Sequence, residues 1–212
     1  MKPFIDPPVM PVTNETAEER LKQSVPLFNT PGLPYIEKRG ISPEIAHTAS
    51  VRFDANWNGR PALIVPMVNS DHTLCSVHGR YLSVTGKQNK MFTIGPGGGA
   101  LYVGHGWNAE PVILVEGLFD ALSLAMCGYS AVATVGRHAP WLPEVCRDRL
   151  VILAFDSNRP GETEANFYKA FLKGARCYRI TPPGRSKDWN TALMKHGQHG
   201  IELWLKKNNI KN

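Results

Sequence analysis

The stretch Pro111-Val-Ile-Leu-Val-Glu-Gly-Leu-Phe-Asp-Ala-Leu-Ser-Leu-Ala-Met126 decides the fold of this chain. Its mostly β-branched apolar run ends abruptly at Glu116-Gly117, and apolar residues at helical spacing follow at once. This pattern predicts a buried parallel strand, a tight glycine turn and a helix. Glu116 then stands at the carboxyl end of a strand, where open α/β sheets bind their ligands, and Asp120 lies one helical turn further on.

After this stretch the sequence continues to alternate between strand and helix patterns. The predicted strands cover residues 112–115, 131–135, 150–155 and 176–180, and the predicted helices cover residues 119–126, 141–147, 162–173, 189–196 and 201–207. Strand–helix units of this spacing require a parallel sheet with right-handed crossovers and helices on both faces. The predicted fold class is therefore α/β, with a four-stranded parallel sheet flanked by helices.

The residues ahead of Pro111 follow a different pattern. Thr16-Ala-Glu-Glu19 fits a capping box that opens a short helix, and Ser42-Pro43 fits a serine cap with proline at the first helical position. Strand patterns, two of which form a predicted hairpin, follow over residues 51–54, 62–68, 74–82, 91–94 and 100–104. We therefore divide the chain into an N-terminal arm with a short helix (1–32), a small mixed α+β subdomain (33–104) and the α/β domain (105–212).

The composition limits the classes of function. The 212 residues carry a formal net charge of +6, which permits a nucleic-acid partner without requiring one. The four cysteines include no C-x-x-C pair, which argues against a zinc site or a disulfide framework. No apolar run reaches the length of a membrane span, and the N-terminus lacks the apolar region of a signal peptide, so we expect a cytoplasmic protein without membrane association.

Acidic residues follow three of the predicted parallel strands. Glu116 and Asp156 come directly after their strands, and Lys187-Asp188 lies on the loop after the last one. Because the carboxyl ends of parallel strands meet at one edge of a sheet, we expect these side chains to lie close together. Carboxylate oxygens suit Mg²⁺ or Mn²⁺, and such an ion would polarise a phosphoryl group.

Each acid also has a purely structural interpretation. Asp156 and Asp188 are placed to cap the helices that follow them, and Asp120 is placed to interact with the dipole of its own helix. Glu116 is harder to explain in this way, because Glu-Gly directly after an apolar strand is a poor cap. The grouping of the acids at one sheet edge favours the metal site.

Basic residues gather near the predicted hairpin and on the loops beside the acids. Scattered lysines and arginines usually form a solvated surface, but these lie where a polyanion would have to approach. The candidate residues for binding phosphate or nucleic acid are Arg80, Lys87, Lys90, Arg137, Arg159 and Lys187.

Three segments, in this order, resemble the signatures of the Toprim domain. They are Val115-Glu-Gly-Leu-Phe-Asp120, Ala154-Phe-Asp-Ser-Asn-Arg-Pro-Gly161 and Ser186-Lys-Asp-Trp-Asn190, and the family patterns are E-G-x-x-D, D-x-D-x-x-G and K-D-x-[ND]. The most similar members are primases of the bacterial replicative type and their phage and plasmid relatives. Upstream, Tyr35-Ile-Glu-Lys-Arg-Gly-Ile-Ser42 resembles the Y-L-x-x-R-G-L segment ahead of the primase core.

The resemblance implies a Toprim fold and a nucleotidyltransferase that synthesises short RNA primers on single-stranded DNA from nucleoside triphosphates, with Mg²⁺ or Mn²⁺. It implies that Glu116 is the catalytic acid near the reacting phosphate, as ligand or general acid/base, and that Lys187 meets phosphate. The positions implied to hold or support metal are Asp120, Asp156, Asn158 and Asp188. A replicative helicase or a separate zinc-binding module is an implied partner.

Two positions depart from the family pattern. Asn158 replaces the second acid of D-x-D and offers an oxygen without a charge, which predicts weaker metal binding and weaker or lost activity. Asn190 replaces the last acid of the third motif, as we associate with phage and plasmid members. Two alternatives therefore stay open beside the primase, namely a Toprim nuclease or strand-cleaving module and a non-catalytic nucleic-acid-binding subunit.

Overall fold

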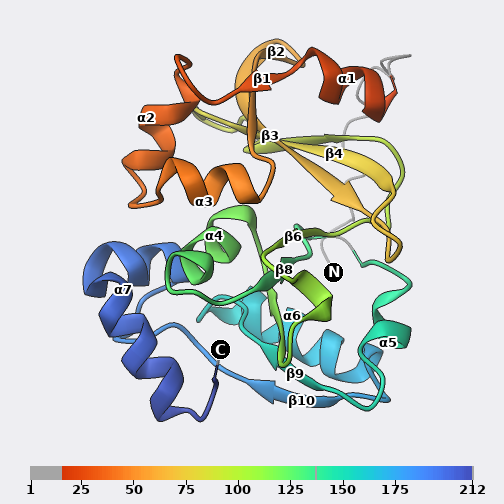
Figure 1. Ribbon diagram of the computed structural model, residues 1–212, viewed down its shortest axis with the longest axis vertical. Helices are drawn as coiled ribbons and strands as arrows, with labels where there is room; N and C mark the ends of the chain where they lie inside the picture. Colours follow the sequence, from red (N-terminus) through yellow and green to blue (C-terminus); the bar gives the residue numbers. More distant parts are fainter. Residues whose placement is uncertain (1–15, 137, 212) are drawn as a thin grey trace.

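Two five-stranded sheets organise the protein, and Figure 1 shows them one above the other. The computed structural model describes residues 16–136 and 138–211. The predicted extended arm over residues 1–13 lies outside the described residues. The N-terminal half of the chain builds the first sheet and the C-terminal half builds the second.

The first sheet is antiparallel, and its strands pair in the order β1-β2-β3-β4-β5. The strands are β1 (Val25–Pro26), β2 (Arg52–Trp57), β3 (Arg60–Val68), β4 (Leu74–Tyr81) and β5 (Met91–Ile94). The predicted hairpin is confirmed as β3 and β4, which pair antiparallel from Ala62 opposite Tyr81 to Val68 opposite Leu74. This hairpin places alternate side chains of β4 on the side that faces the second sheet.

Three helices accompany the first sheet: α1 (Ala17–Gln23), α2 (Gly32–Glu37) and α3 (Pro43–Thr48). Both predicted helix caps are confirmed. The Thr16 hydroxyl accepts a hydrogen bond from the backbone N–H of Glu19, whose carboxylate accepts one from the backbone N–H of Thr16. The Ser42 hydroxyl accepts one from the backbone N–H of Ile45 at the start of α3.

The second sheet has the strand order β10-β9-β7-β8-β6. Its strands are β6 (Leu101–Val103), β7 (Val112–Val115), β8 (Ala131–Ala133), β9 (Leu150–Leu153) and β10 (Arg176–Arg179). The four predicted parallel strands are β7 to β10. The strand predicted over residues 100–104 is β6, which pairs antiparallel with β8 and adds a fifth strand to this sheet.

Helices cover both faces of the second sheet, as predicted. They are η1 (Gly106–Asn108), α4 (Leu118–Met126), α5 (Leu142–Val145), α6 (Arg159–Phe171) and α7 (Trp189–Lys207), the last interrupted at Gly197, where φ is 66° and ψ is 178°. Ile113 and Val115 of β7 pack in the core that includes residues of α4 and α7, and Val112 and Leu114 pack in the core that includes residues of α6. Burial on both faces explains why this strand is apolar at every position.

One hydrophobic core connects the two halves of the protein. Leu63 and Met67 of β3 belong to the same buried cluster as Leu118 and Leu122 of α4. Burial of this shared apolar surface holds the first sheet in a fixed position over α4. Among the described residues, no helix combines the length and the apolar character that a membrane span requires.

Gly79 of β4 leaves room for a fully buried indole of the first sheet. A Cβ atom at Gly79 would lie 1.9 Å from Nε1 of Trp57, which donates a hydrogen bond to the Phe92 carbonyl at 3.0 Å. We predict that Gly79→Ala lowers the free energy of unfolding by roughly 1–3 kcal/mol through overpacking, with a lower Tm in thermal melts. Gly174→Ala is the control, because the nearest atom there is the flexible Cγ of Arg147 at 3.3 Å. Equal Tm values for the two variants would contradict the prediction.

Candidate active site

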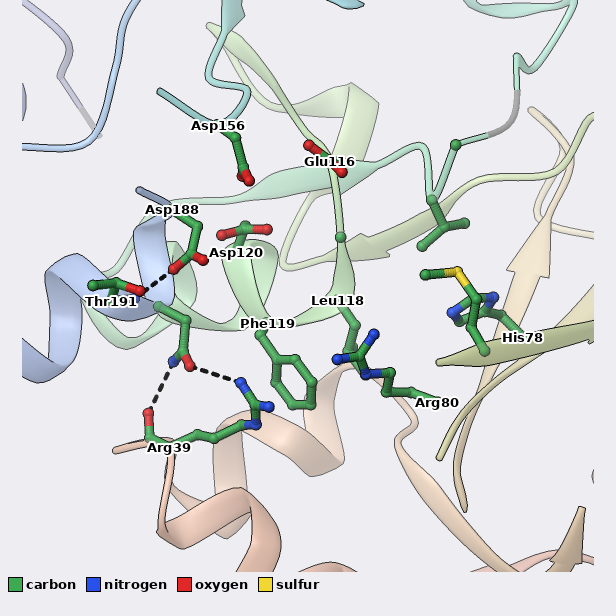
Figure 2. A pocket seen from close by; sticks show the side chains of 15 residues that line it. Arg39, His78, Arg80, Glu116, Leu118, Phe119, Asp120, Asp156, Asp188 and Thr191 are labelled. Atoms are coloured by element: carbon green, nitrogen blue, oxygen red, sulfur yellow. Dashed lines mark hydrogen bonds between the residues drawn. The ribbon is translucent and has the colours of Figure 1, made fainter. Parts of the chain in front are cut away.

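Four carboxylates from three loops meet at the carboxyl edge of the second sheet. Glu116 follows β7, Asp120 lies in the first turn of α4, Asp156 follows β9, and Asp188 precedes α7. All four line one cavity of about 300 Å³, and Figure 2 shows their side chains side by side. The predicted grouping of the acids at one sheet edge is therefore present in the structure.

In the loop after β9, the backbone at Gly161 lies very close to the backbone at Asp156, so this position requires glycine. Asn158 caps α6, since its Oδ1 accepts a hydrogen bond from the backbone N–H of Gly161 at 2.8 Å. A Cβ atom at Gly161 would lie 2.1 Å from the carbonyl oxygen of Asp156. Only glycine fits here without displacing the loop that carries Asp156.

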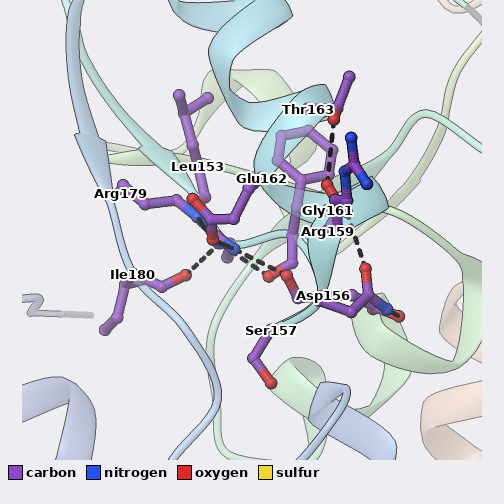
Figure 3. Close-up of polar contacts among 12 residues, drawn as sticks. Leu153, Asp156, Ser157, Arg159, Gly161, Glu162, Thr163, Arg179 and Ile180 are labelled. Carbon is purple, nitrogen blue, oxygen red and sulfur yellow. Dashed lines mark hydrogen bonds and ion pairs between the residues drawn. The ribbon is translucent and has the colours of Figure 1, made fainter.

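An arginine of the edge strand β10 holds the same loop. Arg179 donates hydrogen bonds to the backbone carbonyls of Leu153 at 3.0 Å, Phe155 at 2.7 Å and Asp156 at 2.7 Å. Its guanidinium also pairs with the Glu162 carboxylate at 2.6 Å (Figure 3). These charge-assisted bonds fix the end of β9 and with it the position of Asp156. The role of Arg179 was not predicted, because nothing local to its sequence indicates these long-range partners.

The third loop is attached to the sheet through Trp189. The buried indole of Trp189 donates to the Ala154 carbonyl at 2.7 Å, and its backbone N–H donates to Asp120 Oδ1 at 2.9 Å. Asp188 caps α7 by accepting from the backbone N–H of Thr191 at 2.7 Å. The start of α7 is thereby fixed against both β9 and α4.

Burial and mutual repulsion raise the pKa values of the acids. Burial, followed by repulsion from Asp156 and Asp188, raises the pKa of Asp120 to about 8, against which the hydrogen bond from Trp189 acts weakly. Burial and then repulsion from neighbouring acids also raise the pKa values of Glu116 and Asp156, while the Lys187 charge acts in the opposite direction. A cation among these carboxylates would oppose the repulsion and favour their ionised form.

The opposite side of the cavity is basic and comes from the first half of the chain. Arg39 follows α2, and His78 and Arg80 lie on β4. The Arg39 guanidinium lies 3.9 Å from the centre of the Phe119 ring, and His78 Nδ1 lies 2.9 Å from the Thr93 hydroxyl. Figure 2 shows Arg39, His78 and Arg80 across the cavity from the acids.

The basic residues predicted from the sequence are distributed unevenly around this cavity. Arg80 lines it, whereas Lys87, Lys90 and Arg159 are exposed and do not. Lys187 is exposed on the loop before α7. It lies close enough to Glu116 and Asp156 for its positive charge to counteract part of the rise in their pKa values. Arg137 lies outside the described residues.

Sequence reasoning did not assign Arg39 or His78 to the site. For Arg39, its place in the segment Tyr35–Ser42 that resembles primases was the available signal. For His78 there was none, because only the tertiary packing of β4 brings this side chain to the cavity.

The donor set of the acidic side fits a hard cation. Its donors are all oxygens, which Mg²⁺ and Mn²⁺ prefer. Among residues 16–136 and 138–211, no group of three or more His, Cys, Asp or Glu side chains is arranged so that it could hold a metal ion. A cation at this edge would therefore bind through one or two of the carboxylates, and water and substrate phosphates would complete its coordination, as is usual for Mg²⁺.

Comparison with known proteins identifies the class of this fold. Residues 113–193 match the family model described as Toprim-like, so the predicted Toprim domain is confirmed. Residues 12–96 match the model of a domain of unknown function, DUF7146. No curated protein matched this sequence.

Solved primase structures share the architecture of most of the chain. A DNA primase domain from Pseudomonas aeruginosa superposes with a TM-score of 0.67 at 15% identity, over 90% of this chain and 77% of that one. The Aquifex aeolicus primase, comprising zinc-binding and RNA polymerase domains, gives 0.65 at 16%, over 86% of this chain and 57% of that one. The primase fragment of the bacteriophage T7 primase-helicase gives 0.58 at 20%, over 78% and 70%. The protein therefore has the fold of a primase catalytic core around a Toprim-like domain, and it spans just over half of the Aquifex chain.

The raised pKa of Asp120 leads to a prediction on stability. With an ordinary pKa of 3.8 when unfolded and about 8 when folded, Asp120 makes folding less favourable as pH rises from 4 to 8. Asparagine cannot ionise and keeps an oxygen for the Trp189 N–H. We predict that in EDTA the Tm of Asp120→Asn exceeds that of the wild type by a margin that grows from pH 5 to pH 8. At pH 8 we expect a margin of at least roughly 2 °C, or about 1 kcal/mol. A margin independent of pH in thermal melts would contradict this.

Proposed function

We propose that this chain is the catalytic core of a Toprim-type DNA primase, which synthesises short RNA primers on single-stranded DNA from nucleoside triphosphates with Mg²⁺ or Mn²⁺. The observation that carries the proposal is the single cavity with acids on one side and Arg39, His78 and Arg80 on the other. Such a cavity has groups for a metal-bound triphosphate on both sides: oxygen ligands for cations and cationic donors for phosphate oxygens.

The acids take different roles in this proposal. Asp156 and Asp188 hold metal, with Asp120 and Asn158 as supporting positions. In the structure the Asn158 oxygen is already used as the cap of α6, so a metal at this position would have to share it. Bound Mg²⁺ supplies neutralisation of the triphosphate and stabilisation of the departing pyrophosphate.

Glu116 is the acid best placed to act on the reacting groups. It is the exposed member of the four, and its pKa is raised. A carboxylate with these properties can accept the proton of an attacking hydroxyl or serve as an additional ligand. Lys187, on the adjacent loop, then holds a phosphate oxygen.

In this proposal the basic residues in and near the cavity bind the single-stranded DNA template. Arg80 lines the cavity, and Lys87 and Lys90 lie on the exposed segment that leads into β5. We assign these residues, with Arg137 and Arg159, to contacts with the phosphates of single-stranded DNA. A replicative helicase or a zinc-binding module is the proposed partner, supported by the presence of such modules in the T7 and Aquifex proteins named above.

Substitution of Glu116 tests the enzymatic proposal. We predict that Glu116→Gln lowers primer synthesis on single-stranded DNA by at least about 100-fold, because general acid–base or ligand function is lost while the shape is kept. Glu144→Gln makes the same change at an exposed position of α5 outside the cavity, and it should retain wild-type synthesis. The measurement is incorporation of labelled nucleotides with and without Mg²⁺.

Two further measurements on the wild-type protein, plasmid nicking and Mg²⁺ binding, separate the alternatives. Mg²⁺-dependent nicking of a plasmid, without primer synthesis, would indicate a Toprim nuclease. Absence of both product and Mg²⁺ binding in the wild-type protein would indicate a non-catalytic nucleic-acid-binding subunit.

Asn158 provides a second test of the metal site. Asn158 Nδ2 donates to Asp156 Oδ2 at 3.2 Å, and a carboxylate in its place would repel Asp156. We predict that Asn158→Asp has a lower Tm than the wild type in EDTA, a larger Tm increase on addition of Mg²⁺, and faster primer synthesis. A Mg²⁺-induced increase no larger than that of the wild type would argue against a metal role at this position.

A further inference from the structure

Asn190 occupies the last position of the third motif, where the family pattern has an acid or an asparagine, and its contacts are unlike those of a metal ligand. Its side chain is 8% exposed and lies in the first turn of α7. Its Oδ1 accepts a hydrogen bond from Arg39 Nη1 at 3.1 Å. Its Nδ2 donates to the Arg39 carbonyl at 2.9 Å and to the Ser123 hydroxyl at 3.1 Å.

The surrounding groups fix the direction of this amide. The Ser123 hydroxyl donates its only proton to the Phe119 carbonyl at 2.6 Å, so it faces Asn190 as an acceptor. The Arg39 carbonyl is an acceptor in any case. Two acceptors therefore face one end of the Asn190 side chain, and the Arg39 guanidinium, a donor, faces the other.

A carboxylate cannot satisfy the same partners. One of its oxygens would meet the Arg39 carbonyl, which has no proton, and the Ser123 hydroxyl, which could donate only by giving up its bond to the Phe119 carbonyl. A buried acceptor left without a donor is costly. The additional charge would also lie in a cavity that already contains Asp120 and Asp188. The environment of residue 190 is thus specific for an amide.

The group that this amide holds is Arg39. The Arg39 guanidinium is fixed by Asn190 on one side, by the Tyr35 hydroxyl at 3.0 Å and by the face of the Phe119 ring. Asn190 therefore forms hydrogen bonds with both the backbone and the side chain of Arg39, a residue 151 positions away in the sequence. Figure 2 draws the two hydrogen bonds to Arg39 as dashed lines.

We propose that Asn190 is a positioning residue that holds the Arg39 guanidinium at the cavity surface, where it contacts the phosphates of a bound nucleoside triphosphate. The proposal rests on the proposed function in naming the nucleotide. Asn190 is then no weakened metal position. In place of a carboxylate, residue 190 supplies an amide that holds the Arg39 guanidinium opposite the acids of the cavity.

The test combines ATP binding, primer synthesis and thermal melts on the full chain. The variants are Asn190→Ala, Asn190→Asp, Arg39→Ala, Arg39→Lys and the double variant Arg39→Ala/Asn190→Ala. Asn208→Asp is the matched amide-to-acid control at the C-cap of α7, because the Asn208 side chain donates to the Trp204 carbonyl, has no other hydrogen bond within residues 16–136 and 138–211, and does not line the cavity. Each variant is titrated with ATP and Mg²⁺, and KM and kcat are measured separately.

We expect Asn190→Asp and Asn190→Ala each to weaken ATP binding and raise the KM for nucleotide about ten-fold, which corresponds to roughly 1.4 kcal/mol, with little change in the Mg²⁺ midpoint. Arg39→Lys should bind ATP more tightly than Arg39→Ala. If Asn190 acts through Arg39, Asn190→Ala adds nothing further in the Arg39→Ala background, and the Tm losses of the two single variants are likewise not additive.

Two results would overturn the proposal. Tighter Mg²⁺ binding or faster synthesis by Asn190→Asp would show that residue 190 is a metal position. Fully additive effects of the Arg39 and Asn190 substitutions on ATP affinity and Tm would show that the two residues act independently. Loss of the proposed function would be visible separately, as a wild-type chain that makes no primer, and the melts would still decide whether Asn190 and Arg39 are coupled.

Discussion

Repulsion among carboxylates is the constraint on which the rest of this structure depends. Glu116, Asp120, Asp156 and Asp188 lie at one sheet edge with pKa values raised in three of them. Nothing in their own interactions keeps such groups together. The surrounding bonds do so, because Arg179 holds the end of β9 and Trp189 joins the start of α7 to the sheet. The protein uses the stability of its core to maintain an arrangement that is locally unfavourable.

The fold was predictable because its signals are local. Strands β7, β8 and β9 are buried on both faces and read as apolar runs, each followed by a turn and a helical pattern, so periodicity predicts them. The polar edge strand β10 was predictable from the strand–helix alternation that it continues. The position of β6 was not. A three-residue strand is too short for its sequence periodicity to predict which strand it pairs with. Only the observed pairing with β8 assigns β6 to the second sheet.

Strand-end reasoning predicted only the acidic side of the site, and the basic residues gathered near the hairpin added Arg80 on the other side. Glu116 and Asp156 follow strands directly, and strand ends of a parallel sheet coincide in space. Arg39 and His78 reach the cavity through tertiary packing between the two halves, and Asn190 finds its partner 151 positions away. Contacts of this kind between distant segments cannot be predicted from the spacing of residues in the sequence. The meaning of Asn190 also changed, since its replacement of an acid reads as a loss in the sequence and as a specific amide contact in the structure.

The core shared between the halves has a consequence for how the molecule comes apart. β3 and α4 bury their side chains in one cluster, so the first sheet loses part of its own interior if the second unfolds. The two sides of the cavity then form and melt in a single cooperative transition. Neither half is an interchangeable module, and a chimera that exchanges one of them must also match the partner across that core.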